Sequence, residues 1–193
     1  MFRTAFLMIA LLTLVTGVIY PLAMTGLAHL MFPAQAHGSL LVQDGRITGS
    51  KLIGQQFEDP KYFWSRLSAT APFPYNPASS SGSNYGPLSP DLTKAMASRR
   101  EALRNADPGN TAPIPVDLLT ASGSGLDPHI SPEAAEYQAG RVERVRRLDA
   151  GMVRRLIAAH TEGRQLGFLG EPVVNVVELN RGLDENAAAD SHR

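Results

Sequence analysis

The stretch TAFLMIALLTLVTGVIYPLAMTGLAHLMF, from Thr4 to Phe32, decides the architecture of this chain. It contains no Asp, Glu, Lys or Arg, and it is longer than the roughly 20 residues that a helix needs to cross a bilayer. Leu, Ile, Phe and Val dominate most of it and favour insertion by about 3 to 6 kcal/mol. Pro21 is tolerated in a spanning helix, where we expect it to cause a bend. The sequence therefore predicts one transmembrane helix over residues 5–32.

A cleaved signal peptide is the alternative, because Ala34-Gln35-Ala36 has the small-x-small form of a cleavage site. The apolar run, however, is about twice as long as the 7–15 apolar residues of a signal peptide, and Arg3 alone supplies its basic start. This length favours a retained anchor. Arg3 also favours a cytoplasmic location for residues 1–4, although Arg46 and Lys51 beyond the anchor weaken the charge contrast.

The composition of the chain excludes several classes of protein. Its 18 basic and 18 acidic residues give no net charge, whereas a nucleic-acid-binding surface is strongly basic. The chain has no cysteine, which excludes a disulfide framework, a thiolate zinc site and a cysteine nucleophile. Its five histidines show no ligand spacing, so we expect no metal site. The part beyond the anchor fits a single extracytoplasmic soluble domain, predicted over residues 36–183, with a flexible tail over 184–193.

Local signals predict that this domain belongs to the α+β class. Asp44-Gly45 suits the two-residue turn of a β-hairpin, and Val173–Leu179 is mostly β-branched, as in a strand. Tyr62-Phe63-Trp64 is expected in the core, because aromatic side chains bury a large apolar area. Strands and helices do not alternate regularly, which indicates α+β. Capping residues and apolar spacing predict three helices, over Ser89–Asp107, Ser131–Arg147 and Asp149–Thr161.

The loop from Ser68 to Pro90 is longer than the roughly 12–15 residues beyond which an irregular segment is usually functional or disordered. Its aromatic residues Tyr75 and Tyr85 favour an ordered, functional loop, since disordered segments are poor in aromatics. The segment Gly82–Pro87 could offer N–H groups to an anion. A phosphate-binding loop, however, also needs a lysine and an immediate helix start, and neither follows here. An ordinary Gly/Pro loop is the preferred interpretation.

The segment DLLTASGSGLDPHISP, from Asp117 to Pro132, is the densest polar stretch of the chain. Small hydroxyl residues, glycines, two carboxylates and one histidine converge just before a predicted helix start. Helix starts point N–H groups and positive potential outward, so this is a place for a ligand or a partner. We predict that the contact is formed by Asp117, Thr120, Ser122, Gly123, Ser124, Gly125, Asp127 and His129.

Two interpretations of this polar segment remain open. Asp127 and His129 are an acid–base pair that could activate Ser122 or Ser124, as in a membrane-tethered extracytoplasmic hydrolase. A capped turn is favoured, because Asp-Pro and Ser-Pro are turn chemistry and the chain has no GxSxG motif. Two interpretations also remain for the arginines of the next two predicted helices. They form either a solvated face or a docking site for an acidic partner or lipid headgroups. These arginines are Arg141, Arg144, Arg146, Arg147, Arg154 and Arg155.

Motifs along the whole chain resemble those of the C-subunit family of the Kdp high-affinity potassium-transporting ATPase, a bacterial P-type pump. The segment Asp117–Pro132 is long and unusual enough to be nearly diagnostic of this family. Departures are small, with Leu67 in place of a common proline and Leu88-Ser89 in place of a polar pair. The other matching motifs are Phe32-Pro33, Gly38-Ser39-Leu40, Leu52-Ile53-Gly54-Gln55, Tyr62-Phe63, Ser68-Ala69-Thr70, Gly82-Ser83-Asn84, Gly86-Pro87, Gly170-Glu171-Pro172, Val174-Asn175-Val176 and Leu179-Asn180.

The resemblance implies a non-catalytic subunit with a single anchor in the bacterial inner membrane and its domain on the periplasmic side. Its partners would be the channel-like, potassium-selecting A subunit, the ATP-hydrolysing B subunit, the small F subunit and the lipid bilayer, with no nucleic acid. Potassium would be the transported ion. The chain lacks the DKTGT phosphorylation motif, so it cannot be the subunit that becomes phosphorylated.

The resemblance also implies a catalytic chaperone that raises the ATP affinity of the B subunit. In this family the serine- and glycine-rich segment is proposed to touch the nucleotide, and here it is Ser80, Ser81, Gly82, Ser83 and Asn84. A periplasmic domain cannot reach cytoplasmic ATP, so we expect any such effect to pass through the assembled complex. Carboxylates and carbonyls above the potassium entrance would also suit a cation.

Overall fold

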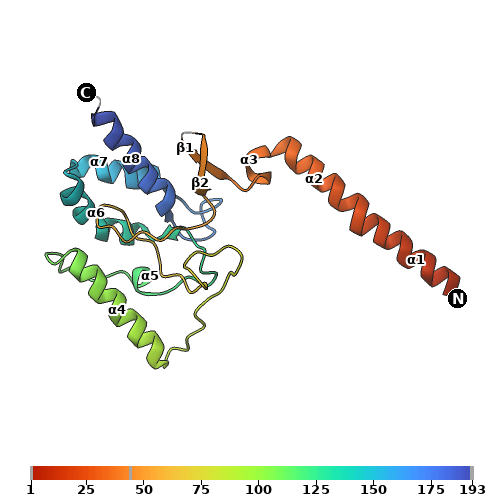
Figure 1. The fold of residues 1–193 in the computed structure, drawn as a ribbon, viewed down its shortest axis with the longest axis horizontal. Coiled ribbons are helices and arrows are strands. Elements are labelled where there is room, and N and C mark those ends of the chain that lie inside the picture. The colour runs from red at the N-terminus through yellow and green to blue at the C-terminus, as the bar shows by residue number, and fades with distance from the viewer. Residues whose placement is uncertain (1, 44, 192–193) are drawn as a thin grey trace. The chain divides into compact units, whose positions relative to one another are not determined.

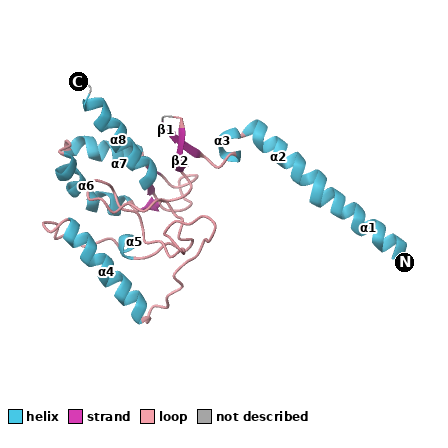
Figure 2. Cartoon of the chain, in the orientation of Figure 1, coloured by secondary structure: helices cyan, strands magenta, loops and turns pink. Residues whose placement is uncertain are grey.

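The computed structural model describes residues 2–43 and 45–191, and it divides the chain into two compact units, residues 1–50 and 51–193 (Figure 1). The first unit contains one long helix, a short helix and a β-hairpin. The second unit contains five helices and a small sheet among its described residues (Figure 2). This mixture of helices and strands confirms the predicted α+β class. The predicted domain limits at residues 36 and 183 stay predictions, and the hairpin groups with the first unit.

The long helix confirms the predicted apolar helix at the N-terminus, and its crossing of a membrane stays a prediction. It runs without interruption from Phe2 to Met31 and is apolar and long enough to cross a bilayer. Its parts are α1 (Phe2–Leu14), the π-helical turn η1 (Val15–Ile19) and α2 (Tyr20–Met31). The π turn lies directly before Pro21, whose ring would clash with the carbonyl four residues earlier in a regular α-helix. A wider turn relieves this clash and accounts for the irregularity expected at the proline.

The hairpin after the anchor returns the chain almost to its starting point. The helix α3 (Pro33–Ala36) precedes the antiparallel strands β1 (Leu40–Gln43) and β2 (Arg46–Ser50), and Leu40 lies opposite Ser50. The Ser50 hydroxyl donates to the carbonyl oxygen of Gly38 at 2.7 Å. The hairpin confirms the prediction made from Asp44-Gly45. Gly45 has the positive φ of 72° that such a turn requires, whereas Asp44 lies outside the described residues.

The second unit confirms the three predicted helices and adds two. Ser131 and Asp149 act as N-caps, since their side chains accept from Ala134 N at 3.1 Å and Met152 N at 3.0 Å. The helices α6, α7 and α8 group together, while α4 packs on α5 (Figure 1). The elements are α4 (Pro90–Ala106), α5 (Val116–Leu119), β3 (His129–Ile130), α6 (Pro132–Arg146), α7 (Ala150–Ala159), β4 (Thr161–Glu162), β5 (Val173–Asn175) and α8 (Val176–Ser191).

The predicted strand Val173–Leu179 is wrong beyond its first three residues. β5 is the central strand of a three-stranded antiparallel sheet in the order β3-β5-β4, and it ends at Asn175. The Asn175 side-chain oxygen accepts from Val177 N and Glu178 N, both at 3.1 Å, so this residue caps α8. The helix then continues to Ser191, through residues 184–191, where a flexible tail was expected. Residues 192–193 lie outside the described part.

The predicted aromatic core is confirmed for two of its three residues, and two amide side chains hold it. Phe63 N donates to Asn180 Oδ1 at 2.8 Å, and Asn180 Nδ2 donates back to the Phe63 carbonyl at 2.9 Å. Likewise, Trp64 N donates to Gln138 Oε1 at 2.8 Å, and Gln138 Nε2 donates to the Trp64 carbonyl at 3.1 Å. These side chains act in place of neighbouring strands, because buried backbone groups need partners. Tyr62 is half-buried, and its hydroxyl donates to Asp184 at 2.9 Å.

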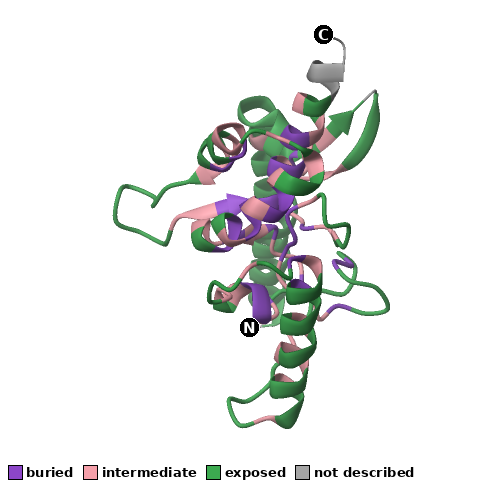
Figure 3. Ribbon diagram, turned by 90° about the vertical axis from the view of Figure 1, so that its left-hand side faces the viewer, coloured by how far each residue is buried: buried purple, intermediate pink, exposed green. Residues whose placement is uncertain are grey.

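Trp64, the only tryptophan of the chain, lies between charged groups in this core. The guanidinium carbons of Arg99 and Arg141 are 5.0 and 4.9 Å from its ring centroid, within the range of cation–π contact. Its indole N–H donates to the Asp59 carbonyl at 3.1 Å. The surrounding buried cluster draws on the helices α4 to α8 and on the sheet. Buried residues are purple in Figure 3. Other large members of the cluster are Leu103, Leu118, Ile130, Val142, Val153, Val174, Leu179 and Leu183.

Candidate functional site

The structure brings the two polar segments singled out in the sequence side by side. Ser81 N and the Ser80 hydroxyl both donate to the carbonyl of Ser124, at 2.9 and 3.0 Å. The Ser68 hydroxyl donates to the Gly125 carbonyl at 2.7 Å. Loop 68–89 and segment 117–129, which are some 40 residues apart in sequence, therefore form one unit of structure. We call this pairing the double loop.

Two glycines permit the close approach of the two segments. Gly125 has a φ of 70°, and a Cβ there would lie 2.6 Å from both the Ser81 carbonyl oxygen and a Thr70 methyl group. At Gly82 a Cβ would lie 2.7 Å from the carbonyl oxygen of Gly123. Gly123, in contrast, has open space around the same position. Glycine is therefore required at residues 82 and 125 by contact between main chains.

The ordered loop predicted from its aromatic residues is observed. Tyr75 and Asn76 are buried, and the Tyr75 hydroxyl donates to the carbonyl of Arg66 at 2.6 Å. The proposed nucleotide-contact residues Ser80, Ser81 and Asn84 are exposed. Gly82 and Ser83 are half-buried.

The remaining predicted contact residues mostly stabilise the fold. Asp117 accepts from the backbone N of Ser131 at 2.8 Å, just before α6. The Thr120 hydroxyl donates to Val116 at 3.0 Å. The Ser122 hydroxyl is buried and accepts from Gly125 N at 3.0 Å, and Ser124 accepts from Leu126 N at 3.1 Å. These bonds fit the capped-turn interpretation.

Asp127 and His129 form the acid–base pair that the sequence suggested. Their Oδ1 and Nδ1 atoms are 3.0 Å apart, and Arg66 Nη1 lies 3.5 Å from the other carboxylate oxygen. The hydrogen bond to Asp127 raises the pKa of His129 although burial opposes this. Burial raises the pKa of Asp127, but the bonds from the His129 side chain and backbone outweigh it and lower that pKa.

The structure does not assemble the hydrolase alternative. Within residues 2–43 and 45–191, the His129 ring has no hydrogen bond to either Ser122 or Ser124. The Ser122 hydroxyl is instead enclosed within its own turn, with 3% of the residue exposed. A nucleophile needs its base within hydrogen-bond reach. The geometry therefore favours the capped-turn interpretation over the hydrolase.

The Asp127–His129 pair predicts that stability depends on pH. The raised pKa of His129 contributes stability fully below about pH 6.5, and this contribution is lost as the pH rises through the folded-state pKa. The contribution of Asp127 is present above about pH 4 and is lost in stronger acid. We expect His129→Gln to lower the free energy of unfolding more at pH 5.5 than at pH 8.5, with a difference below about 1 kcal/mol that thermal or chemical denaturation at the two pH values measures. Equal losses at both pH values would contradict this assignment.

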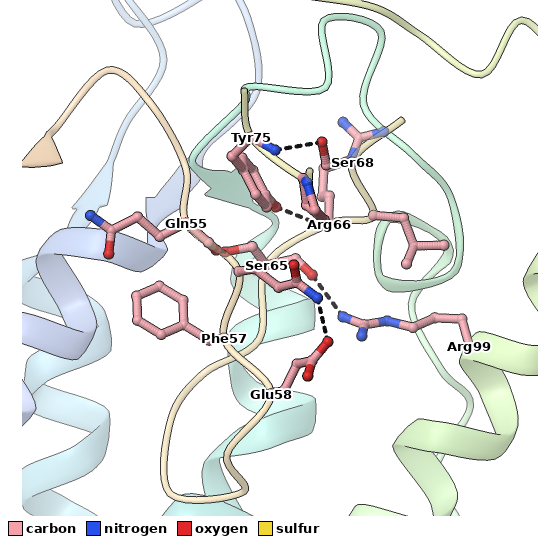
Figure 4. Close-up of a pocket in the computed structure, with 11 residues that line it drawn as sticks. Gln55, Phe57, Glu58, Ser65, Arg66, Ser68, Tyr75 and Arg99 are labelled. Carbon is pink, nitrogen blue, oxygen red and sulfur yellow. Dashed lines mark hydrogen bonds between the residues drawn. The ribbon is translucent and has the colours of Figure 1, made fainter. Parts of the chain in front are cut away.

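A small cleft adjoins the double loop, and sequence reasoning missed it. It has a volume of about 120 Å³ and is lined by Gln55–Glu58, Ser65–Ser68, Pro74, Tyr75 and Arg99. Arg99 extends from α4 toward it and donates to the carbonyl of Ser65 at 2.8 Å (Figure 4). Arg99 also donates to the carbonyl of Leu118 at 3.2 Å. One sequence signal could have revealed Arg99: it occupies the apolar stripe of its helix, between Met96 and Leu103.

The arginines of α6 and α7 are not a uniform solvated face. Arg141 is only 2% exposed, and its guanidinium donates to the carbonyls of Pro60 and Tyr62 and to Gln138 Oε1. Arg146 is paired with Asp184 at 2.7 Å. The solvated-face interpretation is therefore wrong for Arg141, while Arg147, Arg154 and Arg155 are exposed. In the described part of the chain, no three potential ligand side chains lie close enough together to hold a metal ion.

Comparison with known proteins places the chain among subunits of one transporter. A family model described as "K+-transporting ATPase, c chain" matches residues 2–185. A "Potassium-transporting ATPase KdpC subunit" from Methylococcus capsulatus is 62% identical over 183 residues, covering 95% of this chain and 96% of the relative. Proteins of the same name from Dechloromonas aromatica and Variovorax paradoxus are 60% and 59% identical, covering 94% and 97% of this chain and 95% and 97% of theirs.

Proposed function

Since this chain belongs to the KdpC family of K+-transporting ATPase c chains, we propose that it is a non-catalytic accessory subunit of an ATP-driven, high-affinity potassium uptake pump. The family match over residues 2–185 is the observation that carries the proposal. The helix Phe2–Met31 would anchor the subunit in the bacterial inner membrane, with the second unit on the periplasmic side. Its partners would be the potassium-selecting A subunit, the ATP-hydrolysing B subunit and the small F subunit.

The proposed assembly is tested by purification from membranes. We expect the tagged chain to retain the A, B and F subunits in stoichiometric amounts. A tagged variant that ends at residue 35 keeps the anchor and serves as the matched control, and we expect it to retain much less of the complex. If the full chain retains no pump subunit, or if another set of proteins accompanies it, the proposed function is wrong.

The subunit would also act as a catalytic chaperone that raises the ATP affinity of the B subunit. Because the second unit would lie on the opposite side of the membrane from ATP, the effect would be a coupling between distant sites in the complex. The double loop supports this indirect role, since Ser80 and Ser81 are bonded to Ser124. A second role of the double loop would be to aid potassium entry, because its carbonyl and carboxylate oxygens suit a cation.

The coupling is tested by measuring the KM for ATP of the pump with and without residues 36–193. We expect deletion to raise the KM several-fold, with a smaller effect on the maximal rate of hydrolysis. A titration of the full chain alone with ATP should show no binding, and binding there would replace coupling by direct nucleotide contact. An unchanged KM and unchanged potassium transport would refute both roles.

A further inference from the structure

The hairpin that joins β4 to β5 projects apolar side chains into solvent. Leu166 is 83% exposed, Phe168 69% and Leu169 48%. We call residues 165–170, with the sequence QLGFLG, the hairpin tip. It contains no charged residue, and neighbouring large apolar side chains that all remain exposed mark a contact surface.

The hairpin tip is an ordered structure. Gln165 and Leu169 exchange backbone hydrogen bonds, each at 2.9 Å. Below them, Arg164 and Glu171 form an ion pair at 2.6 Å across the base of the hairpin. Leu166 has a φ of 53°, a left-handed conformation that is costly for a residue other than glycine. The chain thus holds a bulky, exposed apolar residue in a strained conformation in the hairpin between β4 and β5.

The hydrogen bonding of the hairpin tip favours lipid over a protein strand as its partner. The amide N–H groups of Gln165, Gly167, Phe168 and Leu169 all donate to carbonyls within the hairpin, at 2.9 to 3.2 Å. Lipid requires that backbone polar groups are satisfied internally, whereas a protein that adds a strand needs free backbone groups. The apolar side chains and the four internally bonded amide groups together match the boundary between headgroups and acyl chains.

The length of the connecting chain allows the hairpin tip to reach the bilayer that holds the anchor. Between the end of the anchor at Met31 and Leu40 lie eight residues, which span at most about 30 Å. Leu40 pairs with Ser50, so the second unit begins close to that point. The side chain of Asn175, at the end of β5, donates to the Lys51 carbonyl at 2.8 Å. From Asn175 back to Gly170 is about 17 Å of extended chain, so the bilayer is within reach.

We propose that the hairpin tip docks on the surface of the bilayer in which the chain is anchored, with Leu166 and Phe168 inserted at the boundary between headgroups and acyl chains. The neutral Arg164–Glu171 pair then lies at headgroup level. This contact is a second attachment of the subunit to the membrane, and it fixes the orientation of β5 and of α8, which follows it. The proposal does not depend on which partners the subunit has.

The absence of cysteine from the chain allows a direct test with single labels. The full chain carrying Phe168→Cys, labelled with the environment-sensitive fluorophore NBD, is reconstituted in vesicles of phosphatidylcholine and phosphatidylglycerol. Leu88→Cys is the matched control, because Leu88 is 95% exposed and lies before α4. We expect blue-shifted emission at position 168 and quenching by doxyl-labelled lipid several-fold stronger than at position 88. Leu166→Cys should behave like Phe168→Cys, and retained Trp64 emission confirms folding.

Two results would overturn the proposal. The first is that the labels at positions 166 and 168 are as exposed to water as the label at position 88. Iodide would then quench all three labels equally, or doxyl lipid would do so. The other is a label that stays in water in vesicles of the chain alone and becomes shielded only when purified pump subunits are added. The second result would identify a protein as the partner of the hairpin tip.

Discussion

Gly125→Val is expected to separate the two segments of the double loop and to destabilise the second unit by about 3 to 5 kcal/mol. A side chain at Gly125 meets the Ser81 carbonyl and the Thr70 methyl group at 2.6 Å, and the left-handed backbone adds strain of its own. Since about 1 kcal/mol corresponds to 2–4 °C in a protein of this size, the thermal midpoint should fall by roughly 6 to 20 °C.

Gly123→Val is the matched control, because it places the same side chain two residues away in open space. We expect this variant to unfold near the temperature of the wild type. Differential scanning fluorimetry of both purified variants measures the difference. If the two valine variants have the same midpoint, the close approach of the segments does not stabilise the fold.

Arg141→Met is expected to cost about 2 to 4 kcal/mol in the free energy of unfolding. Methionine fills a similar space but leaves the Tyr62 carbonyl and Gln138 Oε1 without the donors that the guanidinium supplies. Burial lowers the pKa of Arg141 to about 10, so the group stays charged at neutral pH. Its cation–π contact with Trp64 is lost as well.

The control for this change is Arg155→Met, on the exposed face of α7. Removal of its charge should shift stability by no more than about 0.5 kcal/mol, as at most surface positions. Chemical denaturation monitored by fluorescence or circular dichroism gives both values. A loss at Arg141 no larger than that at Arg155 would show that the buried guanidinium is dispensable.

The elements that sequence predicted well are those with strong local signals. The apolar N-terminal helix, the Asp44-Gly45 hairpin and the Ser-Pro starts of α4 and α6 depend on residues close together in the chain. The strand Val173–Leu179 failed because Asn175 is a strong N-cap and Glu178 follows three residues later, a helix-start pattern within a β-branched run. Val176 and Val177 are then buried in the first turn of α8.

The candidate site was less predictable, because its geometry depends on pairing between distant segments. Each half of the double loop was identified from composition, but nothing local places Ser81 against Ser124. The burial of Arg141 was missed for a related reason. Its guanidinium donates to carbonyls about 80 positions away in the chain, so its place in a row of arginines gave no sign that it is buried. The Gly170-Glu171-Pro172 motif at the end of the hairpin tip gave no sign that Leu166 and Phe168 are exposed.

The two guanidinium groups beside Trp64 have a spectroscopic consequence. The indole of Trp64 is shielded from water, and its emission wavelength should depend on the electric field of the two guanidinium groups. The emission should shift to longer wavelength when the packing around Trp64 opens to water. The subunit therefore contains a native optical reporter at the junction of α4 and α6. Any event that slides one of these helices past the other, even without unfolding, should be readable as a change in colour.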